Sequence, residues 1–333
     1  MKVLKRNRGG GLKLKSIGIV LPVFNGELTI LQCLTALESQ RRRTQDVSLE
    51  IIVVNDGSQD NTLKLIQGYS RKPDSLHMKI ISFTRNFGKE SAIYAGLTQS
   101  QENDATIVLD ADLEHPPELI PTMIDAWLNG ALVVEGIKRS RGTRSITSNL
   151  LVRYFYKIFN YLTQLDINNS TDFKLLDKKV VDALCLLPES NRFFRGLMKW
   201  MDYPAQKIYF DVPKTKDSTS AWNFFSLVRY AVSSITSFSA FPLQIVTFLG
   251  ALTFSISLVI GGVALYDKAS GQAVDGFTTV ILLVLIIGSI LMFSVGMIGV
   301  YIGKIYEEVK RRPSYKILEI ETTEQIAEHQ SNQ

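Results

Sequence analysis

Two aspartates at the end of one apolar run are the residues best suited to chemistry in this sequence. Asp110 and Asp112 are separated only by Ala111, so a strand ending there would project both carboxylates beyond its tip. Carboxylate oxygens suit Mg²⁺ and Mn²⁺, which take further ligands from water and substrate phosphates. The alternative is a capped turn before a helix, because Pro116 and Pro117 fit a first helical turn.

A second polar cluster, Asp56-Gly57-Ser58, ends an earlier apolar run. Asp and Gly are common turn residues, and Ser58 or Asp60 could instead cap the helix that follows. Together with the two later aspartates, however, this cluster favours a nucleotide site. Asp56 would there accept a hydrogen bond from the base or the ribose.

The elements that must position these residues follow a regular alternation between residues 16 and 140. Continuous Val and Ile runs indicate strands buried on both faces, as in a parallel sheet covered by helices. The first five expected strands all end in polar or charged groups, where an open α/β sheet binds its ligands. The expected strands are 16–24, 49–56, 78–84, 105–110, 131–137 and 203–212, and the expected helices are 28–39, 61–70, 89–98 and 117–129.

Two long uncharged segments follow the α/β region. Residues 230–266 and 276–303 contain no Asp, Glu, Lys or Arg, and each exceeds the roughly 20 residues needed to cross a bilayer. We expect spans at 243–266 and 277–303, which form a transmembrane hairpin. Lys and Arg beyond the second span outnumber those of the turn between the spans. This bias places the α/β domain and both termini in the cytoplasm of a cell-membrane protein.

These features predict five consecutive regions. Residues 1–15 are expected to be a basic flexible arm, and residues 16–221 the α/β domain. Residues 222–241 have apolar side chains at helical spacing, which indicates an interfacial helix or, alternatively, a core helix of the soluble domain. The hairpin covers 242–304, and 305–333 is expected to be a cytoplasmic tail that is helical and solvated or disordered.

Composition excludes several classes of protein. With 46% hydrophobic and 21% charged residues, the chain is too apolar for a disordered protein. A net charge of +5 over 333 residues, without a basic stripe, argues against a nucleic-acid partner. Cys33 and Cys185 alone form neither a metal motif nor a disulfide framework. Glycines in the spans permit close helix packing and a homo-oligomer, for which a tetramer is one arrangement.

Four motifs, taken in order, resemble the family-2 glycosyltransferases of the GT-A fold. They are Pro22–Asn25, Val54–Thr62, Arg85–Lys89 and Asp110–Glu118. More narrowly, the chain resembles the polyprenyl-phosphate glycosyltransferase branch, which includes dolichol-phosphate mannose synthase, and is most similar to bactoprenol (undecaprenyl) phosphate glucosyltransferases. The likeness covers about residues 16–312 and is extended by Thr171–Leu176 and Arg192–Leu197.

The resemblance implies a nucleotide-sugar donor, Mg²⁺ or Mn²⁺ as cofactor, and a polyprenyl phosphate acceptor in the membrane. The metal is expected at Asp110 and Asp112, with Glu114 where the branch commonly has Gln. The implied reaction is an inverting hexose transfer, with UDP-glucose favoured and UDP-galactose, GDP-mannose and a modified arabinose left open. The nucleotide is expected to lie against Pro22, Val23, Asn25, Glu27, Asp56, Asn86, Lys89, Asp110 and Ala111.

The acceptor needs cationic positioning more than a strong base. A phosphate monoester has a second pKa near ~6, so at neutral pH it is already mostly the nucleophilic anion. Guanidinium groups pair with phosphate in a bidentate manner, which favours arginines for this task. For Arg139, Arg141 and Arg144, the alternative is a run of solvated surface charges. Asp172 is expected to orient the acceptor or to act as base. Beside Asp112, the candidates are Arg139, Arg141, Arg144, Ser148, Arg192 and Arg195.

The sequence departs from the family pattern at two places. Asn25-Gly26-Glu27 stands where Asn-Glu-Glu is common, and the 215–222 loop lacks the usual Arg and Gly, which leaves Lys214 or Lys216 to supply charge.

A processive polysaccharide synthase would carry a Gln-x-x-Arg-Trp motif, which this sequence lacks. A non-catalytic partner of a glycolipid flippase would not need both aspartates of the Asp-x-Asp motif.

Overall fold

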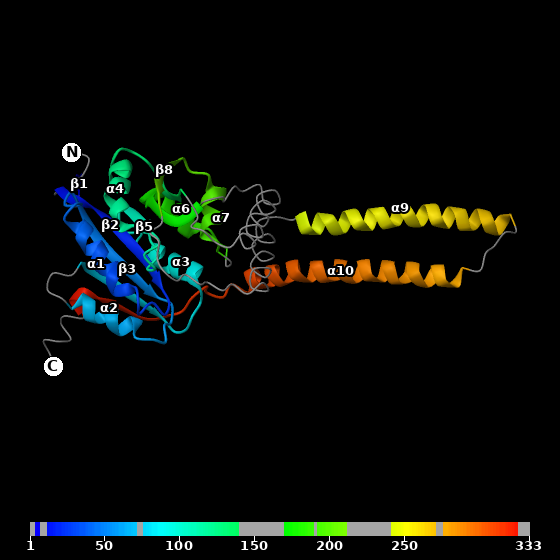
Figure 1. Cartoon of the computed structure of the whole chain (residues 1–333), viewed down its shortest axis with the longest axis horizontal. Coiled ribbons are helices and arrows are strands. Elements are labelled where there is room, and N and C mark those ends of the chain that lie inside the picture. Colours follow the sequence, from blue (N-terminus) through cyan, green and yellow to red (C-terminus); the bar gives the residue numbers. More distant parts are fainter. Residues whose placement is uncertain are drawn as a thin grey trace. The chain divides into compact units, whose positions relative to one another are not determined.

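The computed structural model describes residues 4–6, 12–71, 76–139, 170–189, 192–211, 241–270 and 276–325. These residues fall into two compact units. The first holds the described residues up to 211 together with 313–325, and the second holds 241–270 and 276–312. Figure 1 shows a twisted sheet with helices in the first unit and two long helices in the second.

The first unit is built on a mostly parallel sheet with the strand order β8-β6-β7-β5-β2-β3-β4-β9, to which β1 is added by pairing with β2. The pairs β2–β3, β2–β5, β3–β4 and β6–β8 are parallel, whereas β7 runs antiparallel to both β5 and β6. The strands are β1 (Leu4–Arg6), β2 (Leu12–Val23), β3 (Val47–Asn55), β4 (His77–Phe83), β5 (Ala105–Val108), β6 (Val133–Lys138), β7 (Ser170–Asp177), β8 (Ala205–Phe210) and β9 (Ile317–Thr322).

Helices cover both faces of this sheet, which explains the continuous apolar strands. On one face, Ile19 and Ile51 are fully buried in a core shared with α1, α2 and α4. On the other face, α3 lies so close to β2 that a Cβ added at Gly96 would be 2.3 Å from Val20. The helices are α1 (Ile30–Arg41), α2 (Thr62–Ser70), α3 (Lys89–Gln99), the 3-10 turn η1 (Pro117–Leu119), α4 (Ile120–Leu128), α6 (Lys178–Leu186) and α7 (Phe194–Met201).

The strand directions bring the polar segments to one edge. Because β2, β3, β4 and β5 are parallel, the loops that follow them begin at the same edge. Strand β7 is antiparallel to its neighbours, so its first residues, from Ser170 to Asp172, also lie at this edge. The α/β prediction and the predicted strands and helices between residues 16 and 140 are confirmed.

Two expectations at the chain ends are wrong. Residues 4–6, expected in a flexible arm, form β1 and pair with 12–14 of β2. Residues 317–322, expected in a helical or disordered tail, form β9, which extends the sheet along the edge of β4. The predicted interfacial helix at 222–241 lies, apart from its last residue, outside the described residues, as do the loop 214–221 and the residues Arg141, Arg144 and Ser148.

The second unit consists of α9 (Phe241–Ala269) and α10 (Phe277–Lys310), which contain the two predicted spans and lie side by side in Figure 1. One described segment, Ile286–Lys310, is long and apolar enough to cross a membrane, with a mean hydropathy of 2.0 and nothing buried inside the molecule. In α9 the corresponding apolar stretch is the shorter Val246–Ile260.

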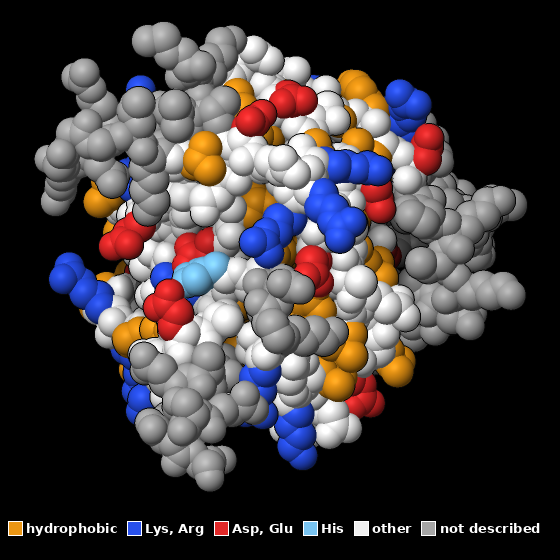
Figure 2. Space-filling view, turned by 90° about the vertical axis from the view of Figure 1, so that its left-hand side faces the viewer, with side chains coloured by type: hydrophobic (Ala, Val, Ile, Leu, Met, Phe, Trp, Pro, Cys, Tyr) orange, Lys and Arg blue, Asp and Glu red, His pale blue; other side chains and the backbone are white. Residues whose placement is uncertain are grey.

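Figure 2 shows one face of the molecule in space-filling form. On this face, Lys and Arg side chains are interspersed with Asp and Glu, and hydrophobic side chains occur mostly in small groups. Such mixing of both signs is typical of a solvated protein surface. Surface charge alone therefore does not mark a binding site on this face.

Candidate active site

A cavity of about 400 Å³ opens at the carboxyl edge of the parallel strands. This volume lies within the range of small-molecule sites, roughly 300–1,000 Å³. Glu27 is the one predicted nucleotide-binding residue that is absent from its wall. The wall includes the other eight, namely Pro22, Val23, Asn25, Asp56, Asn86, Lys89, Asp110 and Ala111, together with Asp112.

Glu27 and Asn25 join the first two strand-end loops. Glu27 Oε2 accepts hydrogen bonds from the backbone and side-chain nitrogens of Asn61, at 3.1 and 3.3 Å. Asn25 has a positive φ of 49°, and its Oδ1 accepts from the backbone N–H of Gln59 at 2.9 Å. Glu27 therefore ties the two loops together without lining the cavity, while Asn25 contributes to its wall.

Asp56 holds the loop that follows β4. Its two carboxylate oxygens accept from the backbone N–H groups of Phe87 and Gly88, at 2.6 and 2.9 Å. Only 2% of Asp56 is exposed, and burial raises the pKa of its carboxyl despite these bonds. Gly57 must remain glycine here, because its φ is +67° and an added Cβ would lie 2.4 Å from the carbonyl carbon of Arg85.

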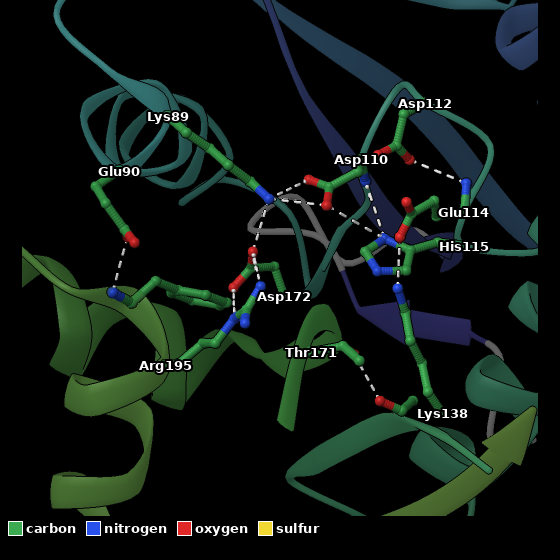
Figure 3. A network of polar contacts seen from close by, with 12 residues as sticks. Lys89, Glu90, Asp110, Asp112, Glu114, His115, Lys138, Thr171, Asp172 and Arg195 are labelled. Carbon is green, nitrogen blue, oxygen red and sulfur yellow. Dashed lines mark hydrogen bonds and ion pairs between the residues drawn. The ribbon is translucent and has the colours of Figure 1, made fainter. Parts of the chain in front are cut away.

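Lys89 bridges two carboxylates at the centre of the site (Figure 3). As the first residue of α3, it places Nζ 2.7 Å from Asp110 Oδ1 and 2.7 Å from Asp172 Oδ2. Arg195, from the first turn of α7, reaches the same Asp172 through Nε at 2.6 Å and Nη2 at 2.8 Å. The network joins α3, β7, α7 and the end of β5, so it fixes their mutual positions.

These contacts set the charges of the network. Burial alone would raise the pKa of Asp172, but its hydrogen bonds and charge pairing with Arg195 and Lys89 hold that pKa well below its usual range. Burial would lower the pKa of Lys89, and the two carboxylates raise it instead. At neutral pH, Asp172 is therefore an anion and Lys89 a cation.

The Asp-x-Asp segment forms part of the same cavity wall. The side chain of Asp112 is exposed, and its Oδ1 accepts from the backbone N–H of Glu114 at 2.9 Å. Glu114 Oε2 lies 2.6 Å from Lys138 Nζ, at the end of β6. Leu113 between them has a φ of +62°, which is strained for a residue other than glycine.

The buried side chain of His115 holds the Asp110–Asp112 segment in place. Its Nδ1 accepts from the backbone N–H of Asp110 at 3.2 Å, and its ring stacks on Phe173 with centroids 5.3 Å apart. Burial lowers the pKa of His115 to about 4, so it is neutral at pH 7 and can accept this bond. Through His115, the segment that carries Asp110 and Asp112 is thereby fixed to Phe173 of β7.

The carboxylates of this wall fit a hard divalent cation. Among the described residues, no group of three or more His, Cys, Asp and Glu side chains converges on one point. Asp110 and Asp112 both line the cavity, however, and Mg²⁺ is commonly held by one or two carboxylates plus substrate phosphates. The donor set therefore fits a metal with two protein ligands, while the Glu114 carboxylate pairs with Lys138.

The remaining predicted arginines differ in position. Arg139 follows β6, and its side chain is 64% exposed, with Nη1 4.0 Å from Asp211. Arg192 packs its guanidinium 3.3 Å from the centroid of Tyr94 and donates to the Leu184 and Leu187 carbonyls, so it supports α6 rather than the cavity.

Sequence reasoning assigned no role to three residues that shape the site. They are Glu90, His115, which lies within the Asp110–Glu118 motif, and Lys138, which follows the fifth expected strand. Glu90 Oε2 accepts from the backbone N–H of Phe194 at 2.8 Å, which fixes the first turn of α7 and hence Arg195. Burial, together with the charge of Asp172, raises the pKa of Glu90 to about 7, against the opposing effects of Lys89 and Arg195. Only its place beside Lys89 in the motif could have pointed to Glu90.

Comparison with known proteins identifies the family. The family model described as "Glycosyl transferase family 2" matches residues 18–185. An uncharacterised glycosyltransferase of Synechocystis sp. is 36% identical over 314 residues, which cover 91% of this chain and 95% of that protein. The bactoprenol glucosyl transferase of Shigella phage SfII is 36% identical over 304 residues, covering 90% and 97%.

Among solved structures, a mannosyltransferase from Pyrobaculum calidifontis in complex with GDP-Man and Mn²⁺ matches with a TM-score of 0.42. It is 16% identical, and the match covers 84% of this chain and 86% of that one.

Proposed function

This chain belongs to glycosyl transferase family 2, and we propose that it transfers a hexose from a nucleotide-sugar to a polyprenyl phosphate at a membrane surface. The observation that carries the proposal is the cavity at the sheet edge, whose wall combines the strand-end loops with Asp110 and Asp112. The relatives named bactoprenol glucosyl transferase support the lipid acceptor and favour glucose as the sugar.

On the donor side, the loops after β2, β3 and β4 would hold the nucleotide, and the Asp-x-Asp wall would face the diphosphate. Asp110 and Asp112 would hold Mg²⁺ or Mn²⁺, which as a Lewis acid stabilises the negative charge of a leaving diphosphate. Lys89 brings a further positive charge to the same wall. The bond that breaks joins the sugar C1 to the diphosphate oxygen.

On the acceptor side, a phosphate oxygen of the lipid attacks C1 and leaves a sugar phosphodiester with an inverted anomeric centre. Asp172 is ion-paired with both Lys89 and Arg195, and its pKa is held low, which favours an orienting role over that of a base. Arg195 and the exposed Arg139 are the described cations that we assign to the acceptor phosphate. Arg144 and Ser148 remain predictions for the same task.

Chain connectivity supports a membrane hairpin. Strands β4 and β9 pair in one sheet, so these two strands lie on the same side of a membrane. An even number of crossings must then separate them. With 34 residues at ~1.5 Å each, α10 is ~51 Å long and exceeds a hydrocarbon core of ~30 Å, and α9 would make the other crossing.

A hairpin explains how the enzyme meets its acceptor. Removing a long isoprenoid chain from lipid exposes each CH₂ group to water at about 0.8 kcal/mol. The catalytic unit must therefore work at the headgroup level, which we place on the cytoplasmic side because Lys304, Lys310, Arg311 and Arg312 follow the second span. We propose a homo-oligomer as the arrangement in the membrane, because the glycines of both spans permit close packing.

The proposal is tested with full-length protein in lipid nanodiscs, labelled UDP-glucose and undecaprenyl phosphate. Label in the chloroform phase, absent with Asp112→Asn, supports it, and parallel reactions with UDP-galactose and GDP-mannose define the sugar. Label in an insoluble polymer would indicate a processive synthase. Absence of transfer with every donor would contradict the proposal.

A further inference from the structure

The segment that follows α10 packs against the end of β4. The ring of Tyr315 stacks on Phe83, the last residue of β4, with centroids 5.0 Å apart and an interplanar angle of 11°. The Tyr315 ring also meets Tyr94 of α3 edge-on, at 6.1 Å and 64°. Tyr315 thus contacts the two elements that flank residues 84–88, which we call the donor loop.

Both the backbone and the side chains of the donor loop continue this contact. At its start, the backbone N–H of Thr84 donates to the Lys316 carbonyl at 3.1 Å. Further along, the ring of Phe87 meets Phe83 edge-on, at 5.8 Å and 89°. An aromatic chain therefore runs from Tyr315 through Phe83 to Phe87.

The donor loop carries much of the cavity wall. Asn86 and Gly88 line the cavity, and the backbone N–H groups of Phe87 and Gly88 bind Asp56. Lys89, the next residue, bridges Asp110 and Asp172. A shift of this loop would alter the nucleotide site and the central charge network together.

Strand β9, which follows Tyr315, is anchored separately by contacts at its far end. Gln67 Nε2 donates to Glu321 Oε2 at 2.7 Å, and the backbone N–H of Met78 donates to Thr323 Oγ1 at 2.9 Å. In the register, Glu321 pairs with Ile80, three residues before Phe83. The anchor and the aromatic contact can therefore be altered separately.

We infer that Tyr315 is a positioning residue for donor binding, acting through Phe83 and Phe87 on the donor loop; the donor itself rests on the proposed function. Without the Tyr315 ring, the loop samples other conformations, and the nucleotide-sugar must bear the free-energy cost of ordering it. An aromatic pair contributes about 0.5–1.5 kcal/mol, which corresponds to about a 2- to 12-fold weaker donor affinity.

The test compares Tyr315→Ala with Tyr315→Phe, which keeps the stack, and with Glu321→Ala, which removes only the anchor bond. In the full-length protein, we expect Tyr315→Ala to raise the KM for the nucleotide-sugar about 2- to 12-fold and to leave the KM for the lipid phosphate unchanged. Tyr315→Phe, which keeps the ring and loses only the hydroxyl's bond with Thr98, should stay far closer to the wild type than Tyr315→Ala. Glu321→Ala should lower the melting temperature without changing the donor KM.

Hydrogen exchange separates this inference from the proposed function, because it needs no substrate. We expect the amides of the donor loop to exchange about ten-fold faster in Tyr315→Ala than in the wild type and in Glu321→Ala. Unchanged exchange in Tyr315→Ala, equal loosening in Glu321→Ala, or failure of Tyr315→Phe to restore protection would overturn the inference. Faster exchange in a protein that transfers no sugar would sustain it and reject the proposed function.

Discussion

Replacing Asp172 by asparagine tests the central charge network most directly. The Asp172 side chain is 5% exposed and contacts three cationic nitrogen atoms, from Lys89 and Arg195, within 2.8 Å. Asparagine keeps the size of the side chain but removes its charge. Lys89 would retain Asp110 as a partner, whereas Arg195 would lose the carboxylate to which both its Nε and its Nη2 donate.

The expected loss of stability follows from the exposure of the partners. Breaking a fully buried ion pair destabilises a protein by about 3–5 kcal/mol. The side chains of Lys89 and Arg195 are 43% and 30% exposed, so water recovers part of this energy. We expect Asp172→Asn to lower the free energy of unfolding by about 2–3 kcal/mol at pH 7, or the melting temperature by about 4–12 °C.

The stabilisation that Asp172 provides should depend on pH in one direction. The folded pKa of Asp172 is depressed, so its stabilising contribution is present above the unfolded pKa, near ~3.9, and is lost as the pH falls through the folded pKa. The gap in melting temperature between wild type and variant should be constant from pH 7 to about 5 and should narrow below about 4.

The assay is thermal unfolding of the detergent-solubilised protein, followed by tryptophan fluorescence over this pH range. Asp112→Asn is the matched control, because that carboxylate is exposed and accepts only the Glu114 backbone bond among those described. We expect it to melt within about 2 °C of the wild type. A melting temperature of Asp172→Asn equal to that of the wild type at pH 7 would refute the reasoning, as would a gap that persists unchanged at pH 3.

Three further outcomes are expected. Asp112→Ala should lower the transfer rate by at least about 10²-fold while leaving the circular dichroism spectrum intact, and near-normal turnover would reject its role at the diphosphate. Burial raises the folded pKa of Glu90 to about 7, so the wild type loses stability as the pH rises from about 5 to 7. Glu90→Gln does not titrate and should therefore become more stable relative to the wild type over that range. A difference in melting temperature that does not change with pH would contradict the raised pKa. Gly57→Ala should weaken nucleotide binding and destabilise the fold by about 1–3 kcal/mol, because the φ of +67° and the contact with Arg85 both oppose a Cβ, and calorimetric binding equal to the wild type would argue against that contact.

The parallel core could be predicted from the sequence because each of its strands is a local signal. Ile19, Val20, Ile52 and Val53 are all fully buried, and this burial on both faces gives the apolar runs that mark β2 and β3. The parallel direction then brings the ends of these strands to one edge. Asp56, Asp110 and Asp112 could therefore be grouped before any contact between them was known.

Strands β7 and β9 could not be predicted in this way. In β7, Asp172 and Lys174 are both buried and charged, and they are tolerated there because Lys174 pairs with Glu135 on β6 and Asp172 pairs with Lys89 and Arg195. Strand β9 is short, alternates apolar and acidic residues, and joins β4 from more than 230 positions away. Both depend on partners that are distant in the sequence.

The charge balance of the site bears on how it could bind two anionic substrates. Asp110, Asp112, Glu114 and Asp172 face three cationic side chains, Lys89, Lys138 and Arg195, so this group carries one net negative charge. A diphosphate and a lipid phosphate would both approach it as anions. In the low effective dielectric of a protein cleft, repulsion between charges about 4 Å apart amounts to several kcal/mol. On the proposed function, a divalent cation at Asp110 and Asp112 would supply the positive charge that this group lacks, and the exposed Arg139 after β6 would add to it.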